Sequence, residues 1–326
     1  MGKVRRRQLL IAAGGLLVGA AFLCSAQPAK VYRVGLVTLS GPEGRAYRDT
    51  FLGAMHGLGY VEGTNIVFDI REAGAAAQVP GLVDELIALN PDVLVGWESV
   101  VQVMRAKTAS IPLVLTGAVD PVKAGLAQSL RRPGMNVTGS AQLNDVLPAK
   151  HIEIARQIIP RLVRVGQLVD TTASGCKLIE ARAREAAHSF GAVLTPYYVA
   201  SREDIERAFS RMESERPDVL LPCPSSVLFA HRDLLFENVL RLRIPLTSYV
   251  VANVPAGVLF AYAASIHEGN RKAATYVDRI LKGAKPGELP IEQPTNLELV
   301  VNLKTAQALK LAIPPAILLR ADRVIE

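Results

Sequence analysis

The stretch Asn90–Val101, with the sequence NPDVLVGWESVV, recurs in altered form at Arg216–Leu228, with the sequence RPDVLLPCPSSVL. Each copy has a proline and an aspartate, an apolar run too short for a helix, and then small or polar residues before a new apolar pattern. This pattern predicts a buried strand and a loop that begins a helix. Roughly one helix later each copy is followed by another strand, at Ile111–Gly117 and at Ile244–Val250. We therefore expect two similar lobes that each contain a β-α-β unit.

Predicted strands alternate with predicted helices along most of the chain. The strands are Val31–Leu39, Asn65–Ile70, Asp92–Gly96 and Pro112–Gly117 in the first half, and Arg164–Val169, Val193–Val199, Asp218–Leu221 and Pro245–Val250 in the second. This alternation favours parallel sheets with right-handed crossovers. The predicted fold class is α/β, with two Rossmann-like (flavodoxin-like) α-β-α lobes joined by a multi-strand hinge. A loop is expected at Ser40–Gly44, and single helices at Arg45–Leu58 and Val227–Leu242.

The lobes are expected to exchange chain segments. The N-terminal lobe is predicted to consist of residues 27–142, with residues 266–290 packing back on it. The C-terminal lobe is predicted to consist of residues 143–265 and 303–326, and residues 291–302 cross between the lobes. Several crossings of this kind make a hinge rather than a loose tether.

Residues 1–26 read as an export signal. A basic segment, MGKVRRRQ, precedes the apolar run Leu9–Leu23, and small residues follow where a signal peptidase cuts. The apolar run is interrupted by glycines and is shorter than the ~20 residues that a membrane-spanning helix needs. The pair Arg5-Arg6 fits a twin-arginine signal loosely, which leaves the general secretory route open. Lipid anchoring through Cys24 is not expected, because Leu23 stands where a lipidation motif has a small residue. A periplasmic location follows.

Composition narrows the function classes. Half of the 326 residues are hydrophobic and 21% are charged, which is ordinary for a globular protein. Four of the seven net positive charges lie in the export segment, and no basic cluster remains that would predict nucleic-acid binding. The chain has no metal-binding spacing, no phosphate-binding loop and no serine-hydrolase motif. We therefore expect no enzymatic activity, no metal site and no cofactor. A monomer is expected.

Cys176 and Cys223 remain after the export segment, and both follow predicted strands of the second lobe. Two free thiols are the expectation, and a disulfide between them is the alternative.

Loops at the carboxyl ends of parallel strands are where ligands bind in open α/β sheets. The two sets of loops are predicted to face each other across one cleft, with a small-molecule solute between them. The first-lobe candidates for contact with the solute are Ser40, Glu43, Trp97, Glu98, Ser99 and Asp120, and the second-lobe candidates are Thr171, Ser174, Pro224, Ser225, Tyr249 and Tyr262. For Ser99, Ser226 and Asp120, capping of the helix that follows is an equally good interpretation as contact with the solute.

Motifs spread over nearly all of the chain after the export segment resemble a known family, the substrate-binding proteins of ABC importers that include tryptophan- and tyrosine-binding members. The motifs are Gly59–Gly63, Asp120-Pro121-Val122, Arg132-Pro133-Gly134, Asn136–Gly139, Tyr276–Pro286, Glu292–Thr295, Asn302–Ala306, Ile313–Pro315 and Arg320–Glu326. The resemblance implies a type I periplasmic binding fold without catalysis. It also implies as partners the transmembrane subunits of an ABC permease with a separate ATPase. By position, it supports ligand contacts from Ser40, Ser99, Asp120, Ser174, Ser225 and Tyr249.

The chain departs from the family pattern in two places. Trp97-Glu98-Ser99 stands where relatives commonly have Thr-Pro-Ala, and Thr171-Thr172 stands where they often have Asn-Pro. A glutamate in the cleft would disfavour an anionic ligand, so the departures put amino-acid specificity in doubt. The alternatives are a ligand-sensing regulator of the same fold, which would need a helix-turn-helix, and a hydrolase or lyase that uses Glu98 or Asp120 as its base.

Overall fold

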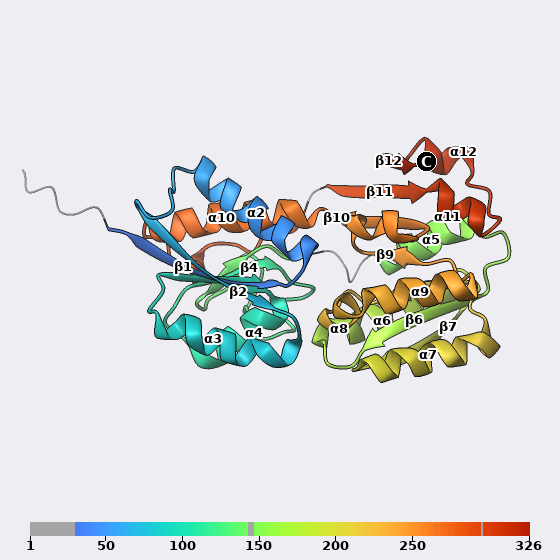
Figure 1. The fold of residues 1–326 in the computed structure, drawn as a ribbon, viewed down its shortest axis with the longest axis horizontal. Coiled ribbons are helices and arrows are strands. Elements are labelled where there is room, and N and C mark those ends of the chain that lie inside the picture. The colour runs from blue at the N-terminus through green and yellow to red at the C-terminus, as the bar shows by residue number, and fades with distance from the viewer. Residues whose placement is uncertain (1–29, 143–146, 295) are drawn as a thin grey trace, which may run out of the picture.

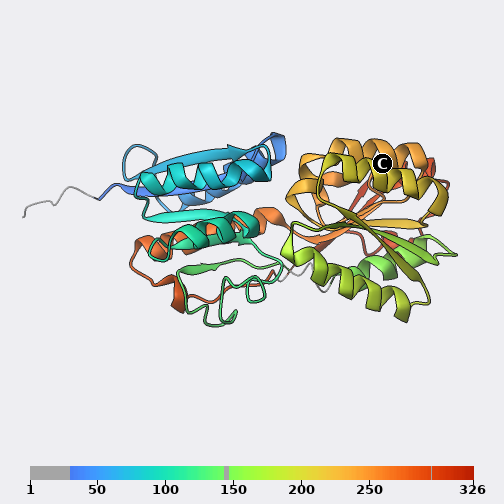
Figure 2. The same ribbon diagram turned by 90° about the horizontal axis from the view of Figure 1, so that it is seen from below.

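The computed structural model describes residues 30–142, 147–294 and 296–326. Two α/β lobes lie side by side along the longest axis of the molecule (Figures 1 and 2). The expected export segment, residues 1–26, lies outside the described residues. None of the helices in the described part of the chain has both the length and the apolar character that a membrane crossing requires.

The first lobe contains a five-stranded parallel sheet in the order β2-β1-β3-β4-β5. This is the strand order of flavodoxin-like folds. The strands are β1 (Tyr32–Leu39), β2 (Ile66–Ala73), β3 (Val93–Trp97), β4 (Leu113–Gly117) and β5 (Val137–Gly139).

Helices cover both faces of the first sheet (Figure 1). One face packs against α2 (Pro42–Gly57) and α10 (Ile266–Leu281), and the other against α3 (Val79–Ala88) and α4 (Glu98–Lys107). Short 3₁₀ turns, η1 (Ala76–Gln78) and η3 (Pro286–Glu288), complete the lobe. Because apolar side chains of the strands enter the cores on both faces, the strands read as nearly continuous hydrophobic runs.

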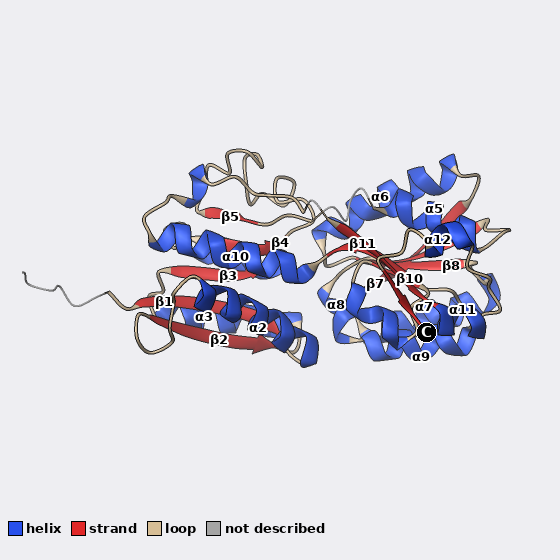
Figure 3. Ribbon diagram, turned by 90° about the horizontal axis from the view of Figure 1, so that it is seen from above, coloured by secondary structure: helices blue, strands red, loops and turns tan. Residues whose placement is uncertain are grey.

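The second lobe joins two strand groups into one twisted sheet (Figure 3). The parallel group has the order β7-β6-β8, and an isolated bridge between Leu220 and Leu246 connects it to the group β9-β10-β11-β12. Only β11 runs antiparallel to its neighbour β10. The strands are β6 (Arg164–Asp170), β7 (Val193–Val199), β8 (Val219–Pro222), β9 (Thr247–Ser248), β10 (Phe260–Ala264), β11 (Leu297–Asn302) and β12 (Arg323–Ile325).

Two hydrophobic cores flank this sheet. One core holds side chains of α5 (Pro148–Ile158), α6 (Ser174–Ser189), α11 (Leu303–Ala308) and α12 (Pro315–Leu318). The other holds side chains of α7 (Arg202–Glu215), α8 (Ser226–Ala230), α9 (Arg232–Leu242) and the 3₁₀ segment η2 (Val251–Ala256). Two α-β-α sandwiches result, which confirms the predicted fold class.

The chain passes between the lobes three times. It leaves the first lobe between β5 and α5, and it returns between β10 and α10, whose residues pack with those of α2. It leaves the first lobe again after Glu292, which pairs with Ser140, and then forms β11 beside β10. Figure 1 shows this return, because the orange helix α10 lies beside the blue helix α2.

Two local predictions were wrong. The expected loop at Ser40–Gly44 is shorter, because Pro42 occupies the first turn of α2, where its missing N–H costs no helical hydrogen bond. The expected single helix Val227–Leu242 is divided into α8 and α9 at His231, whose φ of −111° and ψ of 24° are not helical.

The structure pairs Cys176 with Cys223 in a disulfide, so the expectation of two free thiols was wrong. Their Cα atoms lie 5.7 Å apart, because Cys176 lies in the first turn of α6 after β6, while Cys223 directly follows the neighbouring strand β8. This separation suits a disulfide. Both cysteines are 1% exposed, in a small core with Val119 of the first lobe and Tyr249 of the second.

Loss of this disulfide is expected to destabilise the fold. The double variant Cys176→Ala/Cys223→Ala should lower the free energy of unfolding by about 2–4 kcal/mol, because the cross-link restricts the unfolded chain. Urea denaturation of the two proteins measures the difference, and a reductant should shift the unmodified protein but not the variant. Titration of two free thiols at these positions in the denatured, unreduced chain would contradict the pairing.

Candidate functional site

A cavity of about 560 Å³ lies between the two lobes. Residues at the carboxyl ends of strands line it from both sides, because β1 and β3 of the first sheet and β8 and β9 of the second end there. Of the residues predicted from sequence, six line the cavity: Ser40, Trp97, Ser99, Pro224, Ser225 and Tyr249. The structure thus brings together residues of both lobes that are up to 209 positions apart in the chain, from Ser40 to Tyr249. Contact of a ligand with them remains a prediction.

Two helices begin at the cavity wall with different caps. Gly41 precedes α2 with a φ of 97°, a conformation that favours glycine. Ser225 precedes α8, and its side-chain oxygen accepts a hydrogen bond from the backbone N–H of Leu228 at 3.2 Å. Ser225 therefore caps a helix and lines the cavity at once. Ser99 and Ser226 lie inside the first turns of α4 and α8 and are not the capping residues.

Trp97 ends β3, where the pairing with β4 shifts its register. Its ring lies over Gly117, since a Cβ added to that glycine would collide with the ring. The absence of a side chain at Gly117 is what lets the indole lie across the end of β4. Trp97 remains partly exposed and forms an apolar wall of the cavity.

Tyr249 forms part of the second-lobe wall. It is 3% exposed, and its phenolic oxygen has no hydrogen-bond partner. Burial raises the pKa of this phenol above its usual range, so it stays a neutral hydrogen-bond donor. The ring stacks on that of His151, with centroids 4.3 Å apart.

His151 of α5 holds Tyr249 from behind. One ring nitrogen, Nε2, donates to the carbonyl of Tyr262 at 2.8 Å, and the other, Nδ1, accepts from the hydroxyl of Thr247 at 3.0 Å. A carbonyl can only accept, so Nε2 carries a proton, and in the neutral ring Nδ1 is then the acceptor for the hydroxyl of Thr247. Burial lowers the pKa of His151 to about 4, in agreement with the neutral form.

Two carboxylates expected in the cleft do not line the cavity. Glu98 is 6% exposed, and its Oε2 accepts a hydrogen bond from the backbone N–H of Val119. Asp120 accepts a hydrogen bond at 3.0 Å from the backbone N–H of Lys123, and its carboxylate lies 3.7 Å from the ammonium of that lysine. Both carboxylates therefore hold the loop after β4 in place.

Four other predicted residues do not contribute described side chains to the cavity. Thr171 lines a separate hollow on the second lobe, while Tyr262 packs beside the core that contains Tyr249. The side chains of Glu43 and Ser174 lie outside the part of the chain whose side chains the structure describes.

Sequence reasoning missed lining residues that helices contribute. They include Tyr47, Arg48, Gln102, Phe229, Arg232, Phe236, Asn253 and Asn270. Attention to the first two turns of the helices that follow the selected loops would have found Tyr47, Arg48 and Phe229. Asn270 lies on a helix that returns from the second lobe, so no local signal pointed to it.

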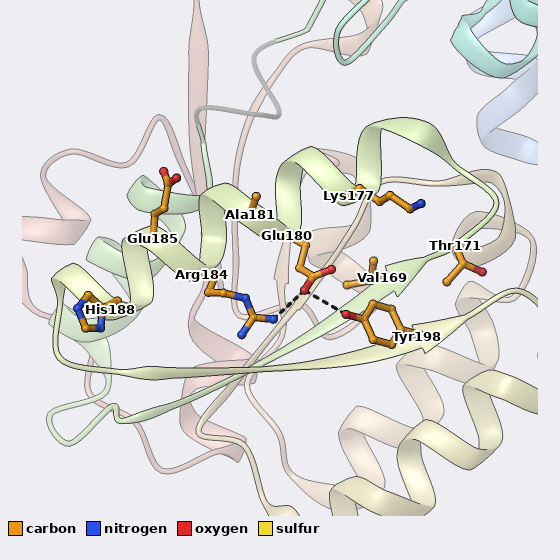
Figure 4. Close-up of a pocket in the computed structure, with 9 residues that line it drawn as sticks. All are labelled: Val169, Thr171, Lys177, Glu180, Ala181, Arg184, Glu185, His188 and Tyr198. Atoms are coloured by element: carbon orange, nitrogen blue, oxygen red, sulfur yellow. Dashed lines mark hydrogen bonds and ion pairs between the residues drawn. The ribbon is translucent and has the colours of Figure 1, made fainter. Parts of the chain in front are cut away.

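A second hollow, of about 790 Å³, lies on the outer surface of the second lobe between α6 and β7. Figure 4 shows the side chains of Arg184 and Tyr198 converging on the carboxylate of Glu180, at 2.7 and 3.2 Å. Despite its larger volume this hollow is a shallow surface formed by one lobe, and Glu180 and Arg184 in it form an ion pair as expected for a solvated helix face. The interlobe cavity is the candidate site.

The buried histidine predicts acid sensitivity. Because the pKa of His151 is lower in the folded protein than its unfolded value near 6.5, the unfolded chain binds more protons between pH 6.5 and about 4. The stabilisation is complete above pH 6.5 and falls by up to roughly 3 kcal/mol as the pH drops through this window.

Urea denaturation across that pH range measures this effect. The variant His151→Gln should lose less stability on acidification than the unmodified protein. The control variant His56→Gln, which alters an exposed residue of α2, should follow the unmodified protein. Parallel pH profiles for all three proteins would show that His151 does not carry the effect.

Comparisons with known proteins agree with this arrangement. A tyrosine-binding protein of Clostridioides difficile is 22% identical over 261 residues, which cover 79% of this chain and 75% of that protein. An ABC domain from Streptococcus pneumoniae, solved in complex with L-Trp, superposes with a TM-score of 0.85 at 23% identity and covers 91% of this chain and 100% of the other. The ligand-free, open structure of a substrate binding protein from Clostridium difficile gives a TM-score of 0.64 at 20% identity, with 90% of this chain and 99% of the other covered.

The family described as ABC transporter substrate binding protein matches residues 34–325, which is nearly all of the described chain. The lobes, the strand order and the interlobe cavity are consistent with that match. The chain belongs to the family of ABC transporter substrate binding proteins.

Proposed function

We propose that this protein captures a small organic solute, an amino acid or an aromatic compound, in the interlobe cavity and delivers it to the permease of an ABC importer. The observation that carries the proposal is a cavity lined by strand ends of both lobes. A ligand that touches both lobes favours the closed arrangement, and a permease can recognise that arrangement. A separate ATPase supplies the energy for transport.

Hinge closure has support in the comparisons. This chain superposes better on the L-Trp complex, with a TM-score of 0.85, than on the ligand-free, open structure, with 0.64, at similar sequence identity. The lobes also contact each other in the described residues, since a Cβ added to Gly175 of the second lobe would lie 2.9 Å from Val119 of the first. Both observations fit a closed form that a bound ligand would stabilise.

Aromatic and apolar walls support an aromatic ligand. Trp97 and Tyr47 of the first lobe and Phe229, Phe236 and Tyr249 of the second line the cavity. Flat rings of this kind pack against aromatic ligands. The tyrosine-binding relative and the L-Trp complex point to the same class for this chain.

Export to the periplasm is part of the proposal. It rests on the basic and apolar segments of residues 1–26, which lie outside the described residues. The protein is proposed to act as a monomer, with the permease subunits as its partner. The alternative is a ligand-sensing or signalling protein of the same fold that binds a solute without transport. Uptake of a labelled ligand that is lost on deletion of the gene would distinguish transport from sensing.

Fluorescence of the single tryptophan tests solute capture directly. Because Trp97 lines the cavity, binding of non-indole aromatic acids or amino acids should change its emission in a saturable way. The unfolding temperature in the same solutions should rise by mass action once the ligand concentration exceeds the dissociation constant. The variant Trp97→Phe should lose the emission signal. Flat titrations together with unchanged unfolding temperatures across both ligand classes would count against the proposal.

A further inference from the structure

We propose that the Cys176–Cys223 disulfide is a site of thiol–disulfide exchange that a dithiol reductant reaches only when the lobes separate, so that a captured solute protects it. This inference rests on the proposed function, from which it takes the opening and closing of the lobes. It adds a redox reaction that is confined to the unloaded protein.

The disulfide belongs to the second lobe, but its cover comes partly from other segments. Cys176 and Cys223 are each 1% exposed. Val119 of the first lobe shares their core, together with Leu147, which directly precedes α5 after the first crossing, and Leu297, which begins β11 after the last crossing. Exchange requires a thiolate to reach one of the two sulfur atoms. The closed arrangement therefore prevents exchange, and a change of conformation must come first.

Val119 is the part of this cover that separation of the lobes would remove. It follows β4, and its backbone N–H donates to Oε2 of Glu98, the first residue of α4, so its backbone is fastened to the first lobe. Its side chain lies against the start of α6, since a Cβ added to Gly175 would be 2.9 Å from Cβ of Val119. Gly175 is the chain neighbour of Cys176. Moving the first lobe away would therefore uncover the disulfide.

The two cysteines differ in a way that gives the exchange a direction. Cys223 lines the interlobe cavity and Cys176 does not, so the opened cleft would present Cys223 to the reductant. Cys176 lies in the first turn of α6, a helix of 16 residues whose N-terminal end favours a thiolate. A thiol with a lower pKa is the better leaving group. Attack at Cys223 with departure of Cys176 is therefore the favoured course.

The reaction consumes one dithiol and leaves two cysteine thiols. One thiolate of the reductant attacks Sγ of Cys223, which forms a mixed disulfide and breaks the bond to Sγ of Cys176. Cys176 leaves as a thiolate and takes up a proton. The second thiol of the reductant then loses its proton and attacks the reductant's own sulfur in the mixed disulfide, which releases Cys223 as a thiolate that is protonated in turn. The protein gains two electrons and two protons, and the dithiol becomes an intramolecular disulfide.

The rate of reduction by dithiothreitol tests the proposal on the full-length protein. Quenched samples are alkylated with iodoacetamide, and peptide mass spectrometry follows Cys176 and Cys223 separately from Cys24. L-tyrosine and benzoate serve as probes of the two proposed ligand classes. A probe that saturates the emission change of Trp97 should slow reduction in proportion to the ratio of its concentration to its dissociation constant, which gives about a hundredfold at a ratio of about 100. In reactions with glutathione that are quenched with acid, the mixed disulfide should form on Cys223.

Low, non-denaturing urea separates lobe opening from global unfolding, which a bound solute would also suppress. Separation of the lobes exposes little surface, so the reduction rate should change little with urea. Exchange through the unfolded chain would instead accelerate steeply with urea.

Two variants change the cover without changing a residue that lines the cavity. Val119→Ala removes apolar contact between the lobes, and it should speed reduction of the ligand-free protein by about tenfold. Its control, Val122→Ala, shortens a 40% exposed side chain of the same loop and should leave the rate unchanged. Gly175→Ala adds a methyl group against Val119 and should also speed reduction. Its control, Gly53→Ala, adds a methyl group where nothing lies within 4 Å, and it should not.

Three outcomes overturn the inference while the proposed function survives. They are an unchanged reduction rate with a probe that saturates the emission of Trp97, a rate that rises with urea as steeply as unfolding does, and equal rates in Val119→Ala, Gly175→Ala and their controls. Glutathione on Cys176 would overturn the direction of attack. If neither probe changes the emission of Trp97 or the unfolding temperature, the result counts against the proposed function, and the rates of Val119→Ala and Gly175→Ala still decide the inference.

Discussion

Three passages of the chain between the lobes constrain everything else in this structure. The helix α10 belongs to the first lobe although it follows β10 of the second, and β11 belongs to the second sheet although it follows the last crossing. Each lobe is therefore built from segments that the other lobe separates in the sequence. Several crossings of this kind would restrict the proposed closure of the lobes to a rotation about the connecting segments. The loops at the strand ends are thereby kept opposite each other, and a cavity between them is the geometric consequence.

A small core supports this arrangement on one side of the cavity. Val119 from the first lobe packs with the Cys176–Cys223 disulfide and Tyr249 from the second. The carboxylate of Glu98 holds the backbone of Val119, while His151 supports the ring of Tyr249. Buried polar groups that had looked like binding candidates therefore shape the cavity from behind, and the side chains that face it are mostly aromatic or small.

The sequence best predicted the features that depend on residues close together in the chain. The repeated strand-loop-helix pattern predicted both lobes and placed six of the twelve selected residues at the cavity. It named Glu98 and Asp120 as well, but their carboxylates accept hydrogen bonds from backbone N–H groups and do not line the cavity, because the direction of such a side chain depends on which N–H groups lie nearby. Arg232 and Asn253 were missed since their approach to the cavity follows from tertiary packing. Whether Cys176 and Cys223 pair depended on the adjacency of β6 and β8, which no spacing in the sequence encodes.

Small-angle X-ray scattering tests the hinge most directly. With a ligand that saturates the emission change of Trp97, the radius of gyration should decrease and the long-distance part of the scattering profile should contract, because closure brings the lobes together. A radius of gyration that is the same for the ligand-free and the saturated protein would contradict capture by lobe closure.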